Sequence, residues 1–74
     1  MADTENKMPR ELVQQLRGLT HDLSNALETI VQANYLVSQA ALPEESRRWV
    51  EMIDKASEEA VRVNRALKEI LRGH

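Results

Sequence analysis

The sequence predicts an all-α fold, an antiparallel two-helix hairpin that pairs with a second copy to form a four-helix bundle. Apolar residues recur in alternating steps of four and three along two long segments, the spacing of helices that pack on neighbours. A Leu-Pro-Glu-Glu stretch between the segments indicates a tight connection. The chain has 74 residues and no cysteine, so an apolar core stabilised by a partner chain is the expected source of stability.

The first helix is expected over about residues 9–41, after a frayed polar tail at residues 1–8. Pro9 suits the first helical position, and Glu11 faces the positive end of the helix dipole. Val13 and Leu27 widen the apolar stripe along this helix. The first half of the heptad seam comprises Leu12, Leu16, Leu19, Leu23, Ala26, Ile30, Ala33, Val37 and Ala40.

The second helix is expected over about residues 43–72, because Pro43 disfavours helix at Leu42 and can open a new one, and Gly73 supplies a stop. So short a connection makes the helices antiparallel neighbours. Two stripes this wide need a second hairpin to cover them, which predicts a homodimer; the alternative is a monomeric hairpin docked on a larger protein. The second half of the seam comprises Trp49, Ile53, Ala56, Ala60, Val63, Leu67 and Ile70.

The composition argues against several classes of function. The formal net charge is −2 with both signs interspersed, so no basic face for nucleic acid is expected. No apolar run is long enough for membrane insertion and no signal segment opens the chain, so a cytoplasmic protein is expected. Two histidines without cysteine are a poor basis for a metal site. Two glycines form no phosphate-cradling loop, so ATP and Mg²⁺ are expected to act only through a partner domain.

His21 is the candidate catalytic residue. The heptad places it on the outer side of the first helix, with Arg17 one turn before it and Ser24 and Asn25 one turn after it. Asp22 follows directly and could accept a hydrogen bond from one ring nitrogen, leaving the other free to attack an electrophile. A lone exposed histidine is more often an ordinary surface residue, so this spacing is suggestive rather than specific.

The stretch Gly18-Leu19-Thr20-His21-Asp22-Leu23-Ser24-Asn25-Ala26-Leu27-Glu28-Thr29-Ile30 closely resembles the H-box of sensor histidine kinases, in the subgroup whose box runs H-D-F/L-N-N-L-L-T. The stretch from Ile53 to Leu67 resembles the second helix of the same dimerisation and histidine-phosphotransfer domain. The resemblance covers about residues 10–72. It implies a phosphoacceptor and dimerisation module of two-component signalling.

The resemblance implies a role for each matching residue. His21 would be the phosphoacceptor, Asp22 the acidic residue that assists transfer, and Asn25 the polar residue that tunes the histidine rotamer and the dephosphorylation of the partner regulator. Many family members have a proline where this chain has Ala26, so its first helix is expected to be straighter. A kinase ATP-binding domain would be the phosphoryl donor, and a response-regulator receiver domain the recipient. By itself the chain is not expected to be a kinase.

A receiver domain is expected to dock beside His21. Folding the hairpin about Leu42 brings the histidine close to the second helix, where Val61 is expected on the outer face without a core to join. The predicted partner-binding residues are Arg17, Ser24, Val61, Arg62, Asn64 and Arg65. Two readings remain open here: a phosphotransfer module, and a purely structural homodimerisation hairpin without phosphotransfer. A helix lying on a membrane surface is disfavoured, because the polar faces mix both charges.

Overall fold

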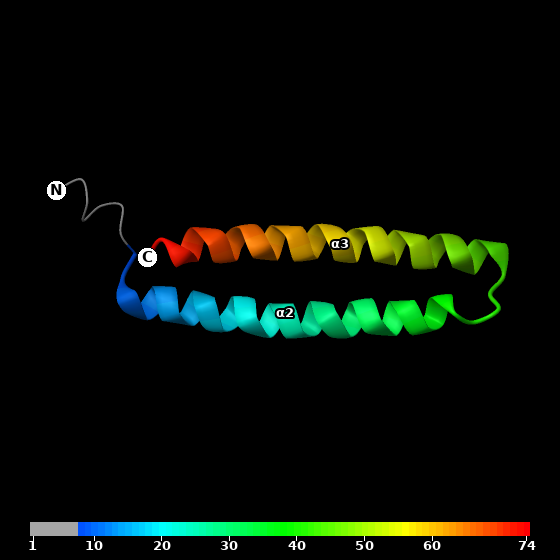
Figure 1. Cartoon of the computed structure of the whole chain (residues 1–74), viewed down its shortest axis with the longest axis horizontal. Helices are drawn as coiled ribbons and strands as arrows, with labels where there is room; N and C mark the ends of the chain where they lie inside the picture. Colours follow the sequence, from blue (N-terminus) through cyan, green and yellow to red (C-terminus); the bar gives the residue numbers. More distant parts are fainter. Residues whose placement is uncertain (1–7) are drawn as a thin grey trace.

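The computed structural model describes residues 8–74, and these form two helices joined by a short turn. α2 spans Arg10–Ser38 and α3 spans Glu44–Arg72. The helices lie side by side and antiparallel, so the first turn of α2 and the last turn of α3 share one end, here called the open end (Figure 1). The predicted all-α hairpin is therefore confirmed. Of the tail expected over residues 1–8, residues 1–7 lie outside the described residues, and Met8 is not helical.

Both helices are slightly shorter than predicted, and each proline sits just outside its helix. Pro9 and Pro43 have extended backbones and act as N-caps, and their carbonyl oxygens accept the first helical hydrogen bonds, from Val13 and Arg47. α2 ends at Ser38 rather than at Ala41, and Gln39 and Ala40 close its last turn with tighter backbone bonds. The link between the helices therefore has five residues, 39–43, and α2 has already ended before the one residue, Leu42, that Pro43 directly restricts.

Gly73 ends α3 where the sequence predicts, but not by a left-handed cap. Its φ is −79°, and its N–H bonds to the carbonyl of Ile70. The chain stops one residue later, and the His74 N–H bonds to the carbonyl of Leu71. Arg72 in the last turn also suits the negative end of the helix dipole.

The two helices touch along a strip that lies beside the predicted seam. We call this strip the inner strip. It comprises Val13, Thr20, Leu27 and Asn34 on α2 and Ser57, Asn64 and Leu71 on α3, all of them buried. Its members are seven residues apart, so they occupy one heptad position on each helix, one step round from the seam. Four of the seven are polar, so the inner strip is not a purely apolar core.

The seam itself is largely exposed in the single hairpin. Among the described residues only Val13, Leu27 and Leu71 are buried hydrophobics, whereas most of the large seam side chains are open to solvent. Trp49, a seam residue, is 56% exposed in the single hairpin, close to the 62% of Tyr35 on the outer side of α2. One hairpin thus buries the flank of its apolar stripe and leaves the centre uncovered. The large exposed seam residues are Leu12, Leu19, Leu23, Ile30, Val37, Trp49, Ile53, Val63, Leu67 and Ile70.

Candidate functional site

His21 lies near the middle of α2 on the face of the hairpin opposite to the seam, here called the outer face. Its side chain is 76% exposed, and that of Asp22 is 80% exposed. With about 3.6 residues per turn, His21 points almost directly away from the line between Leu19 and Leu23. An imidazole held in this way on a long helix is open to a large partner.

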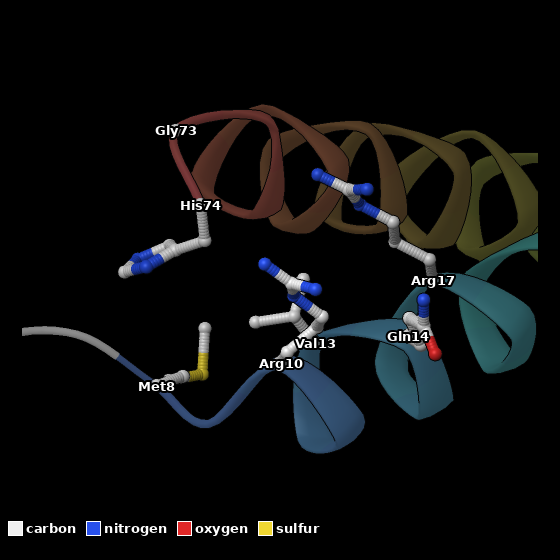
Figure 2. Close-up of a pocket in the computed structure, with 7 residues that line it drawn as sticks. All are labelled: Met8, Arg10, Val13, Gln14, Arg17, Gly73 and His74. Carbon is white, nitrogen blue, oxygen red and sulfur yellow. The ribbon is translucent and has the colours of Figure 1, made fainter.

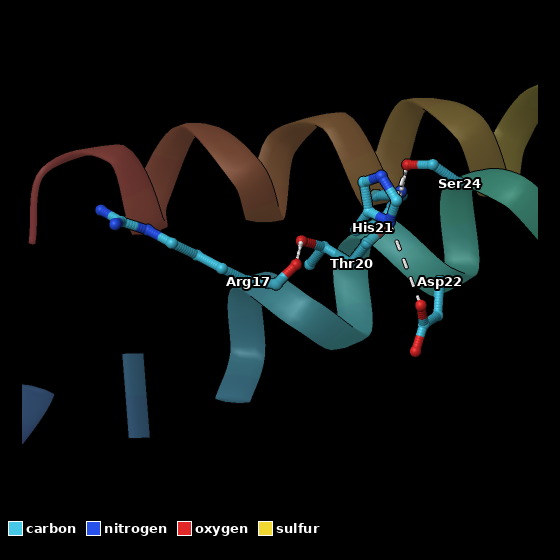
Figure 3. A network of polar contacts seen from close by, with 6 residues as sticks. Arg17, Thr20, His21, Asp22 and Ser24 are labelled. Carbon is cyan, nitrogen blue, oxygen red and sulfur yellow. Dashed lines mark hydrogen bonds and ion pairs between the residues drawn. The ribbon is translucent and has the colours of Figure 1, made fainter. Parts of the chain in front are cut away.

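Asp22 is near the ring but not bonded to it. The His21 Nδ1 atom lies 4.0 Å from the Asp22 Oδ1 atom, farther than a hydrogen bond reaches (Figure 3). Both side chains are exposed, and a rotamer change could bring them into contact. Nδ1 is the ring atom that faces the carboxylate, so Nε2 is the atom with the freer approach. The predicted third member, Asn25, is exposed, and its backbone carbonyl accepts a bond from the Thr29 hydroxyl.

A polar network ties the turn that carries His21 to α3. The Thr20 hydroxyl donates to the Arg17 carbonyl, and the Ser24 hydroxyl donates to the Thr20 carbonyl, each at 2.9 Å (Figure 3). The Asn64 side-chain amide donates across the hairpin to the Thr20 carbonyl at 3.2 Å and to the Ser24 hydroxyl at 2.8 Å. The helix position of the histidine is therefore fixed relative to α3.

This network changes the placement of two predicted partner-binding residues. Asn64 is only 4% exposed, and its buried Oδ1 atom has no hydrogen-bond partner. Ser24 is half-buried, with its hydroxyl engaged by Asn64 and Thr20. Both side chains form hydrogen bonds between the helices, and they border the outer-face groove from within rather than standing open to solvent. For Asn64 the signal in the sequence was its seven-residue spacing from a buried apolar position, because it lies one heptad before Leu71.

Val61 lies on the outer face, as predicted, but it is partly covered by neighbouring side chains rather than without a core to join. It is half-buried in a groove of about 460 Å³ between the two helices on the outer face, together with Leu27 and Val31. Arg65 and Lys68 on α3 and Glu28 on α2 also line the groove. Arg62 is exposed and forms an ion pair with Glu59. Val61 and Arg65 therefore share one surface, while Arg62 is engaged on its own helix.

A second, smaller hollow of about 300 Å³ lies directly beside His21. It is lined by Arg17, Thr20, His21, Lys68, Leu71 and Arg72. The Arg17 guanidinium reaches α3, where Nη2 donates to the Leu71 carbonyl at 3.2 Å. Lys68 and Arg72 were missed from the sequence, because their proximity to His21 depends on how the two helices align. This hollow brings three basic side chains around the candidate phosphoacceptor.

The open end of the hairpin holds a further hollow of about 720 Å³. Arg10, Val13 and Arg17 line it from α2, and Gly73 and His74 from the end of α3 (Figure 2). Within residues 8–74, no three His, Cys, Asp or Glu side chains gather as metal ligands would. Nor does either helix of the described chain combine the length and apolarity that crossing a membrane requires.

The chain was compared with models of protein families, with curated proteins and with solved structures, and none of the three comparisons finds a match.

Proposed function

We propose that this chain is a dimerisation and phosphotransfer module of two-component signalling. It accepts a phosphoryl group on His21 from a donor domain and passes it to an aspartate of a response-regulator receiver domain. The observation that carries the proposal is the opposition of two surfaces. The uncovered seam faces one way, and His21 faces the other. A second copy can cover the seam without blocking the histidine.

The exposed seam supports the dimer. Burying an apolar side chain completely is worth about 1.5–3 kcal/mol, and ten large seam residues are each roughly half exposed. Covering them would release on the order of 10 kcal/mol per copy before the cost of association is subtracted. Contiguous apolar surface of this kind marks an interaction site. Four helices with two seams facing one another form a bundle whose core is the seam.

The surroundings of His21 support the chemistry. Asp22 faces Nδ1, so a rotamer change would allow it to accept the Nδ1–H and leave the Nε2 lone pair free. Nε2 then attacks the donor phosphorus: the N–P bond forms as the P–O bond to the leaving oxygen breaks, and that oxygen keeps the electron pair. The leaving group is ADP when a kinase domain donates, and an aspartate carboxylate when a phosphorylated receiver donates. ATP and Mg²⁺ enter only with such partners.

The groove on the outer face supports a receiver docking site. It presents an apolar floor of Leu27, Val31 and Val61 with Arg65 and Lys68 at its rim, next to the histidine. A receiver domain carries an acidic pocket around its aspartate, so a basic rim would steer it toward His21. We retain Arg17, Val61 and Arg65 as partner-binding residues, in a protein that we expect to act in the cytoplasm.

Labelling with a panel of histidine-kinase catalytic domains and ATP tests the proposal. The native protein should acquire a phosphoramidate, which is labile in acid and stable in base, unlike a phosphoserine at Ser24 or Ser38. His21→Gln should abolish the label. Asp22→Asn should lower the rate of labelling several-fold, and its circular dichroism spectrum should be unchanged. His74→Gln is the matched control and should behave like the native protein.

The competing function is a structural homodimer that keeps the hairpin without phosphotransfer. The exposed seam favours it equally, because covering the seam needs no chemistry at His21. Acid-labile label that persists in His21→Gln, or no label from any donor and none passed to any receiver, would establish this reading instead.

A further inference from the structure

The hollow beside His21 is built from both helices and is basic. Arg17 and His21 come from α2, and Lys68 and Arg72 come from α3. The last part of α3 is unusually cationic: Arg62, Arg65, Lys68 and Arg72 meet only one acidic residue, Glu69, after residue 60. The hollow therefore lies where the positive charge of the hairpin is concentrated.

The cross-hairpin contacts place Lys68 opposite the histidine. Asn64 bonds to Thr20 and Ser24, and Leu71 bonds to Arg17. Lys68 lies one helical turn after Asn64 and one before Leu71, so it faces the stretch of α2 between Arg17 and Ser24. His21 lies within that stretch. The same lysine lines both the hollow beside His21 and the adjoining groove.

Among the described residues, no ion pair neutralises the positive charge of Lys68 or of Arg17. The ion pairs of the described residues are Arg62–Glu59 and Arg72–Glu69, beside the 4.0 Å contact of His21 with Asp22, and none of the three includes Lys68 or Arg17. Arg17 gives one nitrogen to the Leu71 carbonyl, which holds its guanidinium at the rim while other N–H groups stay available. A guanidinium and an ammonium that line the same hollow as an imidazole suit the oxygens of a phosphoryl group.

We infer that Lys68, assisted by Arg17, binds the oxygens of the phosphoryl group carried on His21. This inference rests on the proposed function and adds a phosphoryl-binding residue from the second helix. Lys68 holds the anionic donor close to Nε2 before transfer and neutralises the phosphoryl charge afterwards. The hairpin contact thereby becomes part of the site, because α2 supplies the nucleophile and α3 supplies the counter-charge.

Chemical phosphorylation by phosphoramidate, a small anionic donor, tests this role without a partner protein. The variants are Lys68→Gln, the conservative Lys68→Arg, and the control Lys55→Gln. Lys55 is an exposed lysine of the same helix about 20 Å from Lys68, well beyond the screening length at physiological salt. Lys68→Gln should label His21 about threefold more slowly, since a cation near 6 Å stabilises an approaching anion by that order in water. Lys68→Arg and Lys55→Gln should label at the native rate.

A ³¹P titration of the labelled proteins gives a readout that a merely structural role would not move. The groups facing the phosphoryl are Arg17 and Asp22 from α2 and Lys68, Arg72 and its partner Glu69 from α3. Removing Lys68 should raise the pH at which the phosphoryl group loses its last proton by about 0.5, because a nearby cation favours the dianion.

Equal labelling rates and equal titrations for Lys68→Gln and Lys55→Gln would overturn the inference, as would a native protein that takes no label on His21. A normal Lys68 effect in a protein that no kinase domain labels and no receiver discharges would leave the phosphoryl-binding site standing and overturn only the proposed function.

Discussion

Replacing Ile30 by aspartate tests whether the exposed seam is a dimer interface. Ile30 lies at the centre of the α2 seam and is 45% exposed in the single hairpin. Burying the exposed part against a second copy is worth roughly 1 kcal/mol, or about 2 kcal/mol for the symmetric pair. Replacement by aspartate would remove this apolar burial energy. It would also bury a carboxylate from each copy, which costs several kcal/mol per charge.

Together these terms weaken the free energy of dimerisation by at least about 5 kcal/mol, which corresponds to a more than thousandfold higher Kd for the dimer. The matched control is Tyr35→Asp on the outer face of the same helix, where the side chain is 62% exposed. Isoleucine and tyrosine have similar intrinsic helix propensities, so both variants carry a comparable local cost. The difference between them therefore reports the interface.

Sedimentation equilibrium and thermal melts at several protein concentrations measure the effect. The native protein and Tyr35→Asp should be dimers whose melting temperature rises with concentration, and Ile30→Asp should be a partly unfolded monomer at micromolar concentration. A native protein that is a cooperative, fully helical monomer would refute the reasoning, as would an Ile30→Asp protein that stays dimeric.

Three further outcomes follow from the structure. Iodide should quench Trp49 weakly in the native protein and strongly in Ile30→Asp, because one hairpin leaves this side chain more than half exposed; equal quenching would place Trp49 outside the interface. Asn64→Leu, which keeps the side-chain shape, should change the free energy of unfolding in urea by less than about 1 kcal/mol, since the loss of the hydrogen bonds to Thr20 and Ser24 is offset by the removal of a buried oxygen without a partner; a larger loss would contradict this. Arg65→Glu should slow transfer to a receiver several-fold at low salt without changing the melting temperature, whereas Lys55→Glu should not; equal rates would move the docking site elsewhere.

The helices and their order could be predicted from local rules. The four-three spacing of the apolar residues predicts both helices, and the prolines mark where each begins. The ends were less well predicted. α2 stops three residues before Ala41, because helix ends fray and Gln39 and Ala40 close the last turn with tighter backbone bonds instead of continuing the helix.

In the candidate site, too, the sequence predicts the placement of some residues, and the packing of the two helices decides that of others. The exposure of His21 and Asp22 follows from heptad position alone, because a side chain opposite to the apolar stripe has nothing to pack against. The burial of Asn64 and the half-burial of Val61 depend on which flank of each stripe meets the other helix. Periodicity shows how wide a stripe is but not which part of it the hairpin uses.

By itself, the sequence determined two amphipathic helices, an antiparallel hairpin, and a histidine on the side away from the apolar seam. These depend on the backbone period and on proline, which act within a few residues. Only the tertiary structure decided that the inner strip with Thr20 and Asn64 forms the hairpin contact and that Lys68 stands across from His21. Those outcomes depend on the rotation and the axial alignment of one helix against the other, which are set by the sum of contacts along the whole hairpin, including hydrogen bonds between residues 16 to 54 positions apart.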